Sequence, residues 1–277
     1  MNTRPGEAEQ WGAGLSRMSR GAVEALGDEL YEALVGRVTV EPLKARFSEM
    51  TIDDAYHVQQ RMVQRRQQAG ETVVGKKIGV TSRAVMDMLG VYQPDFGYLL
   101  SGMVYGEGQS IPVASLIQPK AEGEIAFILK KDLLGPGVTN ADVLAATECV
   151  MPCFEIVDSR IHDWKIKIQD TVADNASCGV FVLGDRAVSP RAVDLSTCGM
   201  VLEKNGEVIG TGAGAAALGS PVNAVAWLAN TLGRLGIALK AGEVILSGAL
   251  AAMAPARAGD NFRVSIGGIG SCAVRFV

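Results

Sequence analysis

From residue 71 onward the chain consists of short apolar segments separated by glycine, proline or charged residues. The segments at 72–80, 125–129, 153–157 and 179–183 have the length of β-strands, and they are not arranged as regular βαβ units. No GxGxxG opens a helix after a strand, so a dinucleotide-binding fold is excluded. With 33 glycines and only 5% aromatic residues, many tight turns are expected. This pattern predicts a β-rich body with loops over a site.

Two helices are predicted before this body. Apolar residues recur at helical spacing from residue 21, and Thr51 with Asp54 forms a capping box for a second helix that ends near Gly70. Residues 1–20 show no periodicity. The sequence therefore predicts an α+β protein with three parts, which are a loose tail over 1–20, a helical cap over 21–70 and one catalytic β domain over 71–277.

Turn and capping residues divide the β body further. Asn205-Gly206 predicts a two-residue hairpin, and the segments 262–266 and 272–277 predict a second one. Helices are predicted over 82–89, over 143–150, and from Pro221 onward, where proline favours the first helical position.

Composition limits the partners of this chain. Its 26 basic and 30 acidic residues give a net charge of −4, so neither a nucleic acid nor an anionic membrane is an expected partner. No apolar run reaches the roughly 18 residues of a membrane-spanning helix, and the first 20 residues lack the apolar core of a signal peptide. The five cysteines show no CxxC pair or Cys/His metal spacing and are expected to be buried free thiols. We expect a cytoplasmic protein that binds a small molecule.

The strongest candidate site consists of three glutamates in apolar segments. Glu122 and Glu124 point to one face of a strand because strand side chains alternate, and Glu155 lies in a second apolar segment. Carboxylates that share a pocket repel one another and lose hydration, so one must protonate or a cation must intervene. An all-oxygen ligand set favours Mg²⁺ or Mn²⁺ and leaves positions for water and substrate. The alternative is a solvated strand face, which the apolar surroundings of Glu155 make less favourable.

Three further segments carry polar residues in apolar surroundings. Lys76 and Lys77 project to opposite faces of a strand, so one can enter the pocket while the other reaches solvent. Asp95 follows a proline and either forms a turn or takes part in the chemistry. The small polar residues 174–177 either form a turn or hold a substrate carboxylate. The two histidines give little support to a Ser-His or His-Glu hydrolase.

Six segments in this order resemble the 2-oxopent-4-enoate hydratases of aromatic meta-cleavage pathways, also called 2-hydroxypenta-2,4-dienoate hydratases, within the fumarylacetoacetase-like superfamily. They are GKKIGVTS (75–82), QPDFGYL (93–99), QPKAEGEIAFIL (118–129), PCFEIVDSRIHDW (152–164), VADNASCG (172–179) and LSGAL (246–250). The resemblance covers about residues 21–277 and implies a small N-terminal helical region followed by a mixed β-roll with peripheral helices.

The resemblance also implies roles for individual residues. The metal carboxylates of the family fall on Glu122, Glu124 and Glu155, in agreement with the residue pattern. The lysine of the family's G-x-K-x-G pattern falls on Lys77, and its acid/base aspartate falls on Asp95. The substrate-binding residues that we expect are Ser177, Ser247 and Gly248.

The implied reaction is the addition of water to 2-hydroxypenta-2,4-dienoate, which gives 4-hydroxy-2-oxopentanoate. The related 4-oxalocrotonate decarboxylases resemble this chain in the metal carboxylates and the lysine but carry an apolar residue in place of Asp95, which favours the hydratase. A third possibility is a supporting subunit of a hydratase–decarboxylase complex, although the complete set of carboxylates argues against a degenerate scaffold. A homo-oligomer is also implied.

Overall fold

The structure, a computed structural model, describes residues 17–277, apart from the side chains of residues 84, 88 and 89. The predicted tail over 1–20 therefore lies almost entirely outside the described residues. Within the described chain, no helix is both long and apolar enough to cross a membrane.

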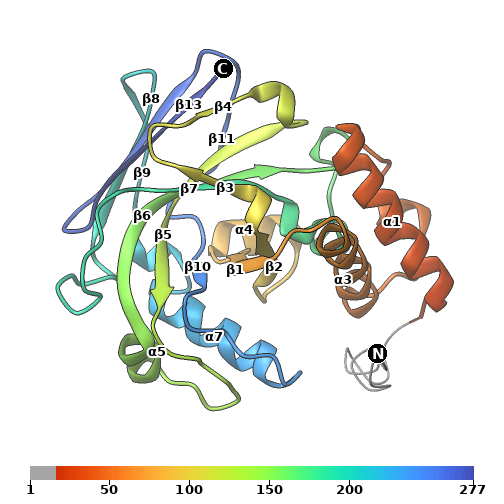
Figure 1. The fold of residues 1–277 in the computed structure, drawn as a ribbon, viewed down its shortest axis with the longest axis horizontal. Coiled ribbons are helices and arrows are strands. Elements are labelled where there is room, and N and C mark those ends of the chain that lie inside the picture. Colours follow the sequence, from red (N-terminus) through yellow and green to blue (C-terminus); the bar gives the residue numbers. More distant parts are fainter. Residues whose placement is uncertain (1–16) are drawn as a thin grey trace.

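Three helices precede the first strand, and α1 and α3 pack against each other on one side of the molecule (Figure 1). They are α1 (Arg20–Gly36), α2 (Leu43–Arg46) and α3 (Ile52–Gln68). α3 begins at the predicted capping box, in which the Thr51 hydroxyl accepts from the backbone of Asp54 and the Asp54 carboxylate accepts from the backbone of Thr51. The apolar faces of α1 and α3 form one buried cluster with a helix of the body. The cluster contains Leu26 and Leu30 of α1, Val58 and Met62 of α3, and Ile168 and Val172 of the later helix, so the body completes the core of the helical region.

A curled eight-stranded sheet forms the centre of the body (Figure 1). Its strand order is β2-β1-β10-β5-β6-β7-β3, and β11 also pairs with β5. The strands are β1 (Val73–Gly79), β2 (Asp95–Leu100), β3 (Val104–Gly106), β5 (Pro119–Leu129), β6 (Thr147–Asp158), β7 (Cys178–Leu183), β10 (Val244–Leu246) and β11 (Ala254–Pro255). The antiparallel pair of β5 and β6 is the longest in the described chain and carries the site discussed below.

A second, five-stranded sheet packs on the other side of the first sheet from α1 and α3 (Figure 1). Its order is β4-β13-β12-β8-β9, with bounds Ser110–Ile111, Gly270–Phe276, Asn261–Ile266, Gly199–Lys204 and Glu207–Ala213. Both predicted hairpins are present, and Asn205 and Gly206 adopt the positive φ angles (54° and 85°) of a two-residue turn. The two sheets meet closely at Gly123, where a Cβ would lie 2.8 Å from a methyl group of Val264.

Four helices and several short 3₁₀ turns connect these strands. The helices are α4 (Arg83–Leu89), α5 (Asn140–Ala146), α6 (Ile168–Ala173) and α7 (Pro221–Gly233), and the turns are η1 (Ser101–Met103), η2 (Val113–Ser115), η3 (His162–Trp164), η4 (Asn175–Ser177) and η5 (Gly214–Ala216). α4 and α7 begin where predicted. The helix predicted over 143–150 is wrong at its end, because residues 147–150 enter β6 and pair with β5. α6 was not predicted.

The predicted α+β class, with a small helical region followed by a curled mixed β-roll, is confirmed by this arrangement. The domain boundaries at 20/21 and 70/71 stay a prediction.

Candidate metal centre

The structure brings the three predicted glutamates together at the middle of the β5–β6 pair. Glu122 and Glu155 lie directly opposite each other across the two strands, and Glu124 projects from the same face of β5 as Glu122. One carboxylate oxygen from each residue lies within 4.8 Å of those from the other two. Glu124 and Glu155 are fully buried, and Glu122 is half-buried.

Two oxygens of these carboxylates lack a protein partner. Within the described residues, Glu124 Oε1 and Glu155 Oε2 have neither a hydrogen bond nor an ion pair, whereas Glu155 Oε1 lies 3.1 Å from Lys77 Nζ and Glu124 Oε2 accepts a hydrogen bond from the backbone N–H of Gly248 at 2.8 Å. Buried carboxylate oxygens without a partner are unfavourable, and a divalent cation between them would compensate the loss of hydration. The donor set contains only oxygen, so the residues present fit Mg²⁺ or Mn²⁺.

Burial changes the acidity of this centre. Burial, together with the nearby charge of Glu155, raises the pKa of Glu122 to about 7. The same two causes raise the pKa of Glu124 well above its ordinary value. Without a cation, Glu122 and Glu124 therefore retain protons near neutral pH.

We expect the metal-free protein to lose stability as the pH rises from about 4.5 to about 7 and beyond. A carboxyl whose pKa is raised by folding binds more protons in the folded state, so the free energy of unfolding falls as the pH rises through that interval. A bound cation replaces these protons, so the increase in Tm caused by Mn²⁺ should be larger at about pH 8 than at about pH 6. Thermal unfolding with and without Mn²⁺ measures this difference. An equal or smaller increase at the higher pH would contradict the prediction.

Lys77 enters the centre from β1. Its Nζ lies 3.1 Å from Glu155 Oε1, and the side chain is 4% exposed. Burial by itself lowers the pKa of Lys77, but the charges of Glu155, Asp95 and Glu122 outweigh it and raise the pKa above its ordinary value. Lys77 is therefore an ammonium ion.

Lys76 lies on the opposite face of β1, as strand alternation predicts. The expectation that it reaches solvent is wrong, because its Nζ lies 2.6 Å from Glu243 Oε1 and its side chain is only 3% exposed. Glu243 lies in the loop before β10, where its carboxylate also accepts from the backbone N–H of Lys240, and the ion pair compensates the buried charge of Lys76.

Asp95 is the first residue of β2 and lies opposite Gly79 rather than in a turn. A Cβ at Gly79 would lie 2.3 Å from Asp95 Oδ1 and 3.3 Å from Lys77 Nζ, so this glycine leaves room for both side chains. The neighbouring Val80 has a φ of 55°, which is strained for a β-branched residue and is typical of functional sites. Burial, opposed by Lys77, raises the pKa of Asp95 to about 6. A carboxyl with this pKa can take up and release a proton near neutral pH.

The three residues expected to bind substrate differ in what they contact. Gly248 donates its N–H to Glu124, and it adopts a φ of 106° that suits glycine. The hydroxyl of Ser247 donates to the carbonyl of Ile125 at 2.8 Å, and that of Ser177 donates to Asp174 Oδ2 at 3.1 Å. Both serine hydroxyls are thus engaged inside the protein, and the substrate-binding role of all three residues stays a prediction.

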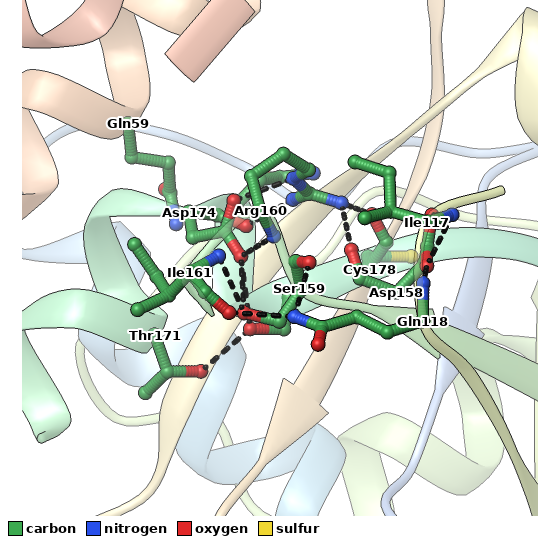
Figure 2. A network of polar contacts seen from close by, with 12 residues as sticks. Gln59, Ile117, Gln118, Asp158, Ser159, Arg160, Ile161, Thr171, Asp174 and Cys178 are labelled. Atoms are coloured by element: carbon green, nitrogen blue, oxygen red, sulfur yellow. Dashed lines mark hydrogen bonds and ion pairs between the residues drawn. The ribbon is translucent and has the colours of Figure 1, made fainter. Parts of the chain in front are cut away.

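Sequence reasoning missed a buried network around Arg160 (Figure 2). The guanidinium of Arg160 donates to Asp174 and to the carbonyls of Asp158 and Cys178, and its backbone N–H also donates to Asp174. Arg160 and Asp174 are essentially inaccessible to solvent. The two residues lie 14 positions apart in separate segments, so no local spacing identified the pair.

This network holds the turn that follows Asp174. Asn175, Ala176 and Ser177 all have positive φ angles (55°, 49° and 51°), a conformation that non-glycine residues rarely adopt in succession. The Asn175 amide accepts from the backbone N–H of Tyr98 and donates to its carbonyl, so it caps the free edge of β2. The turn therefore braces the strand that carries Asp95.

Replacement of Arg160 by methionine is expected to lower the free energy of unfolding by about 3–5 kcal/mol, because it leaves the Asp174 carboxylate buried without its charged partner. Urea denaturation measures the change. Arg83→Met is the control, since Arg83 forms an exposed pair with Asp87 on α4. A loss from Arg160→Met as small as that of the control would contradict a stabilising role for the network.

The sequence matches a known protein family and several named relatives. Residues 66–277 match the family described as fumarylacetoacetate (FAA) hydrolase C-terminal. The chain is 71% identical to a 2-hydroxypent-2,4-dienoate hydratase of Pseudomonas putida over 222 residues, which are 80% of this chain and 100% of that protein. It is 60% identical to a 2-hydroxyhexa-2,4-dienoate hydratase of Comamonas testosteroni, over 92% of this chain and 97% of that protein.

A solved structure has nearly the same fold. The 4-oxalocrotonate decarboxylase from Pseudomonas putida G7, complexed with magnesium and adipate, superposes with a TM-score of 0.91 at 40% identity over 94% of this chain and 99% of that one. The chain therefore belongs to the fumarylacetoacetate hydrolase family, in the group that contains the 2-hydroxypent-2,4-dienoate hydratases and 4-oxalocrotonate decarboxylase.

Proposed function

We propose that this protein is a divalent-metal-dependent hydratase of aromatic meta-cleavage catabolism, which adds water to 2-hydroxypenta-2,4-dienoate and gives 4-hydroxy-2-oxopentanoate. The observation that carries the proposal is the cluster of three glutamates with unpartnered buried oxygens beside Lys77 and Asp95. The 71% identity to a relative with this substrate in its name supports the choice of substrate.

Glu122, Glu124 and Glu155 would hold Mg²⁺ or Mn²⁺. When bound, such an ion would supply Lewis acidity that stabilises negative charge on the enolate form of the substrate. The N–H of Gly248 fixes the orientation of Glu124, and the Lys77 ammonium holds the Glu155 carboxylate in place.

Lys77 would then bind the substrate by a hydrogen bond, and Asp95 would transfer protons. Because the pKa of Lys77 is raised, the ammonium is suited to donate a hydrogen bond to the enol oxygen rather than to act as a base. Asp95 has a pKa of about 6 and is suited to carry protons, to C5 of the dienol or from the water that attacks C4. Loss of the 2-hydroxyl proton and gain of a proton at C5 give an α,β-unsaturated ketone. Water then adds its oxygen at C4 and gives up one proton, and C3 receives a proton.

A spectrophotometric assay tests this function. Loss of the conjugated dienoate absorbance is expected with Mg²⁺ or Mn²⁺ and is expected to stop after a chelator removes the ion. Turnover that is unaffected by removal of divalent ions would contradict the proposal. The same assay is run in parallel with 4-oxalocrotonate.

Decarboxylation of 4-oxalocrotonate is the second candidate, favoured by the TM-score of 0.91 to the decarboxylase. Asp95 is the feature that favours hydration, because the resemblance implies an apolar residue at this position in decarboxylases. Release of carbon dioxide from 4-oxalocrotonate, without consumption of the dienoate, would establish this second candidate instead.

We also propose that the chain forms a homo-oligomer, associates with a 4-oxalocrotonate decarboxylase and acts in the cytoplasm. All five cysteines are free, four of them buried and Cys149 half-buried, which suits a reducing compartment. Val208 and Ile209 on the edge strand β9 are 60% and 44% exposed and offer apolar surface for association. Light scattering after size-exclusion chromatography, with and without the decarboxylase, tests both forms of association.

A further inference from the structure

Lys120 lies on the strand face that carries the metal-centre glutamates. Residues 120, 122 and 124 alternate with buried apolar or glycine positions along β5, so their side chains project from one face. Exposure decreases along this row, from the half-buried Lys120 and Glu122 to the fully buried Glu124. Lys120 therefore lies at the outer end of the row, on the solvent side of the centre.

An aromatic ring holds this lysine in place. Lys120 Nζ lies 4.1 Å from the centroid of the Trp164 ring, and the Trp164 indole N–H donates to the carbonyl of Gln118 at 3.1 Å. A cation–π contact orients the ammonium without using up its N–H donors. The rest of the η3 turn contributes backbone strain, since Asp163 and Trp164 have φ angles of 53° and 55°.

Lys120 differs from Lys76 and Lys77, the two lysines of β1. Lys76 and Lys77 each lie within ion-pair distance of a glutamate. Among residues 17–277, no carboxylate lies within ion-pair distance of Lys120. Its ammonium is thus held in place and still has donors available for a ligand.

The carboxylates of the centre outnumber its positive charges. Four carboxylates, those of Glu122, Glu124, Glu155 and Asp95, face the single ammonium of Lys77. A divalent cation would compensate two of the three remaining negative charges, which leaves a centre that repels an anionic substrate. The charge of Lys120 neutralises that remainder.

We propose that Lys120, positioned by Trp164, binds the carboxylate of the substrate at the entrance of the metal centre and sets the affinity for anionic 2-oxo acids. The inference rests on the proposed function of the same centre and adds a substrate-binding residue to it. Lys120 takes no part in proton transfer. Its removal therefore raises KM or Kd and leaves kcat and metal binding unchanged.

Binding of pyruvate to the Mn²⁺-loaded protein tests this role without turnover. Lys120→Met retains an apolar side chain that packs on Trp164 and removes the charge, and it is expected to weaken pyruvate binding about tenfold, as for loss of one charge-assisted contact. Lys120→Arg retains the charge and is expected to restore most of the affinity. Lys130→Met is the matched control, since Lys130 follows the same strand but lies 46% exposed beside Glu148.

Titration calorimetry gives the Kd of Mn²⁺ first and that of pyruvate second. An unchanged pyruvate Kd in Lys120→Met, or a weakened Mn²⁺ Kd with unchanged pyruvate binding, would overturn the inference. A protein that binds pyruvate through Lys120 but does not hydrate the dienoate would disprove the proposed reaction alone, so the two failures are distinguishable. Where hydration is observed, KM for the dienoate is expected to rise about tenfold with kcat unchanged.

Discussion

Replacement of Glu155 by glutamine is expected to abolish tight binding of the divalent cation and to lower kcat/KM by about 10³-fold or more, the equivalent of losing roughly 4 kcal/mol of transition-state stabilisation. Both oxygens of Glu155 are buried, and within the described residues Oε2 has neither a hydrogen bond nor an ion pair. Glutamine has nearly the same shape but is neutral and offers only one oxygen. The substitution also removes the partner of the Lys77 ammonium, which lies 3.1 Å away.

Titration with Mn²⁺ and the dienoate assay measure the two losses separately. Glu148→Gln is the control, because Glu148 lies on the same strand and is 63% exposed beside Lys130. Wild-type affinity for Mn²⁺ in Glu155→Gln would remove this residue from the ligand set. Loss of the fold would be visible in the circular dichroism spectrum and would distinguish a structural effect from loss of the metal.

Replacement of Asp95 by asparagine is expected to lower kcat by about 10²- to 10⁴-fold and to leave binding of Mn²⁺ and pyruvate unchanged. The amide fits the space beneath Gly79 but cannot carry a proton. Since burial raises the pKa of Asp95 to about 6, the wild-type pH profile should contain a limb near pH 6 that the variant lacks. Incorporation of deuterium at C5 in heavy water should slow by a similar factor.

Asp132→Asn is the matched control, because Asp132 lies at the surface in an exposed pair with Lys240. Full turnover by Asp95→Asn would rule out a proton-transfer role for this residue. A variant with normal hydration of the dienoate and a lost limb near pH 6 would also contradict the proposed role, because the limb would then belong to a group outside the rate-limiting proton transfer.

Much of the local structure follows from residues close together in the sequence. The capping box at Thr51 and Asp54, the turn at Asn205-Gly206 and the start of α7 at Pro221 depend on hydrogen bonds and φ preferences within a few positions. Strand alternation likewise places Glu122 and Glu124 on one face. These features are where the predictions from sequence are confirmed.

Long-range pairing decided what the sequence left open. The segment 147–150 has a helical pattern but becomes strand, because its backbone pairs with β5. The burial of Lys76 depends on its ion pair with Glu243, which lies 167 residues further along the chain. The buried pair of Arg160 and Asp174 has no periodic signal, because each partner lies in a different segment and only the fold excludes water from both.

The sequence by itself determined the kind of centre to expect, since a cluster of three glutamates in apolar strands, with no histidine or cysteine among its ligands, requires either protons or a hard divalent cation. The tertiary structure alone decided which groups share the centre. The register of β5 against β6 places Glu155 opposite Glu122, and the pairing of β1 with β2 places Lys77 beside Asp95. The physical reason is that alternation fixes the face of a side chain along one strand, whereas the register between strands depends on the packing of the whole sheet.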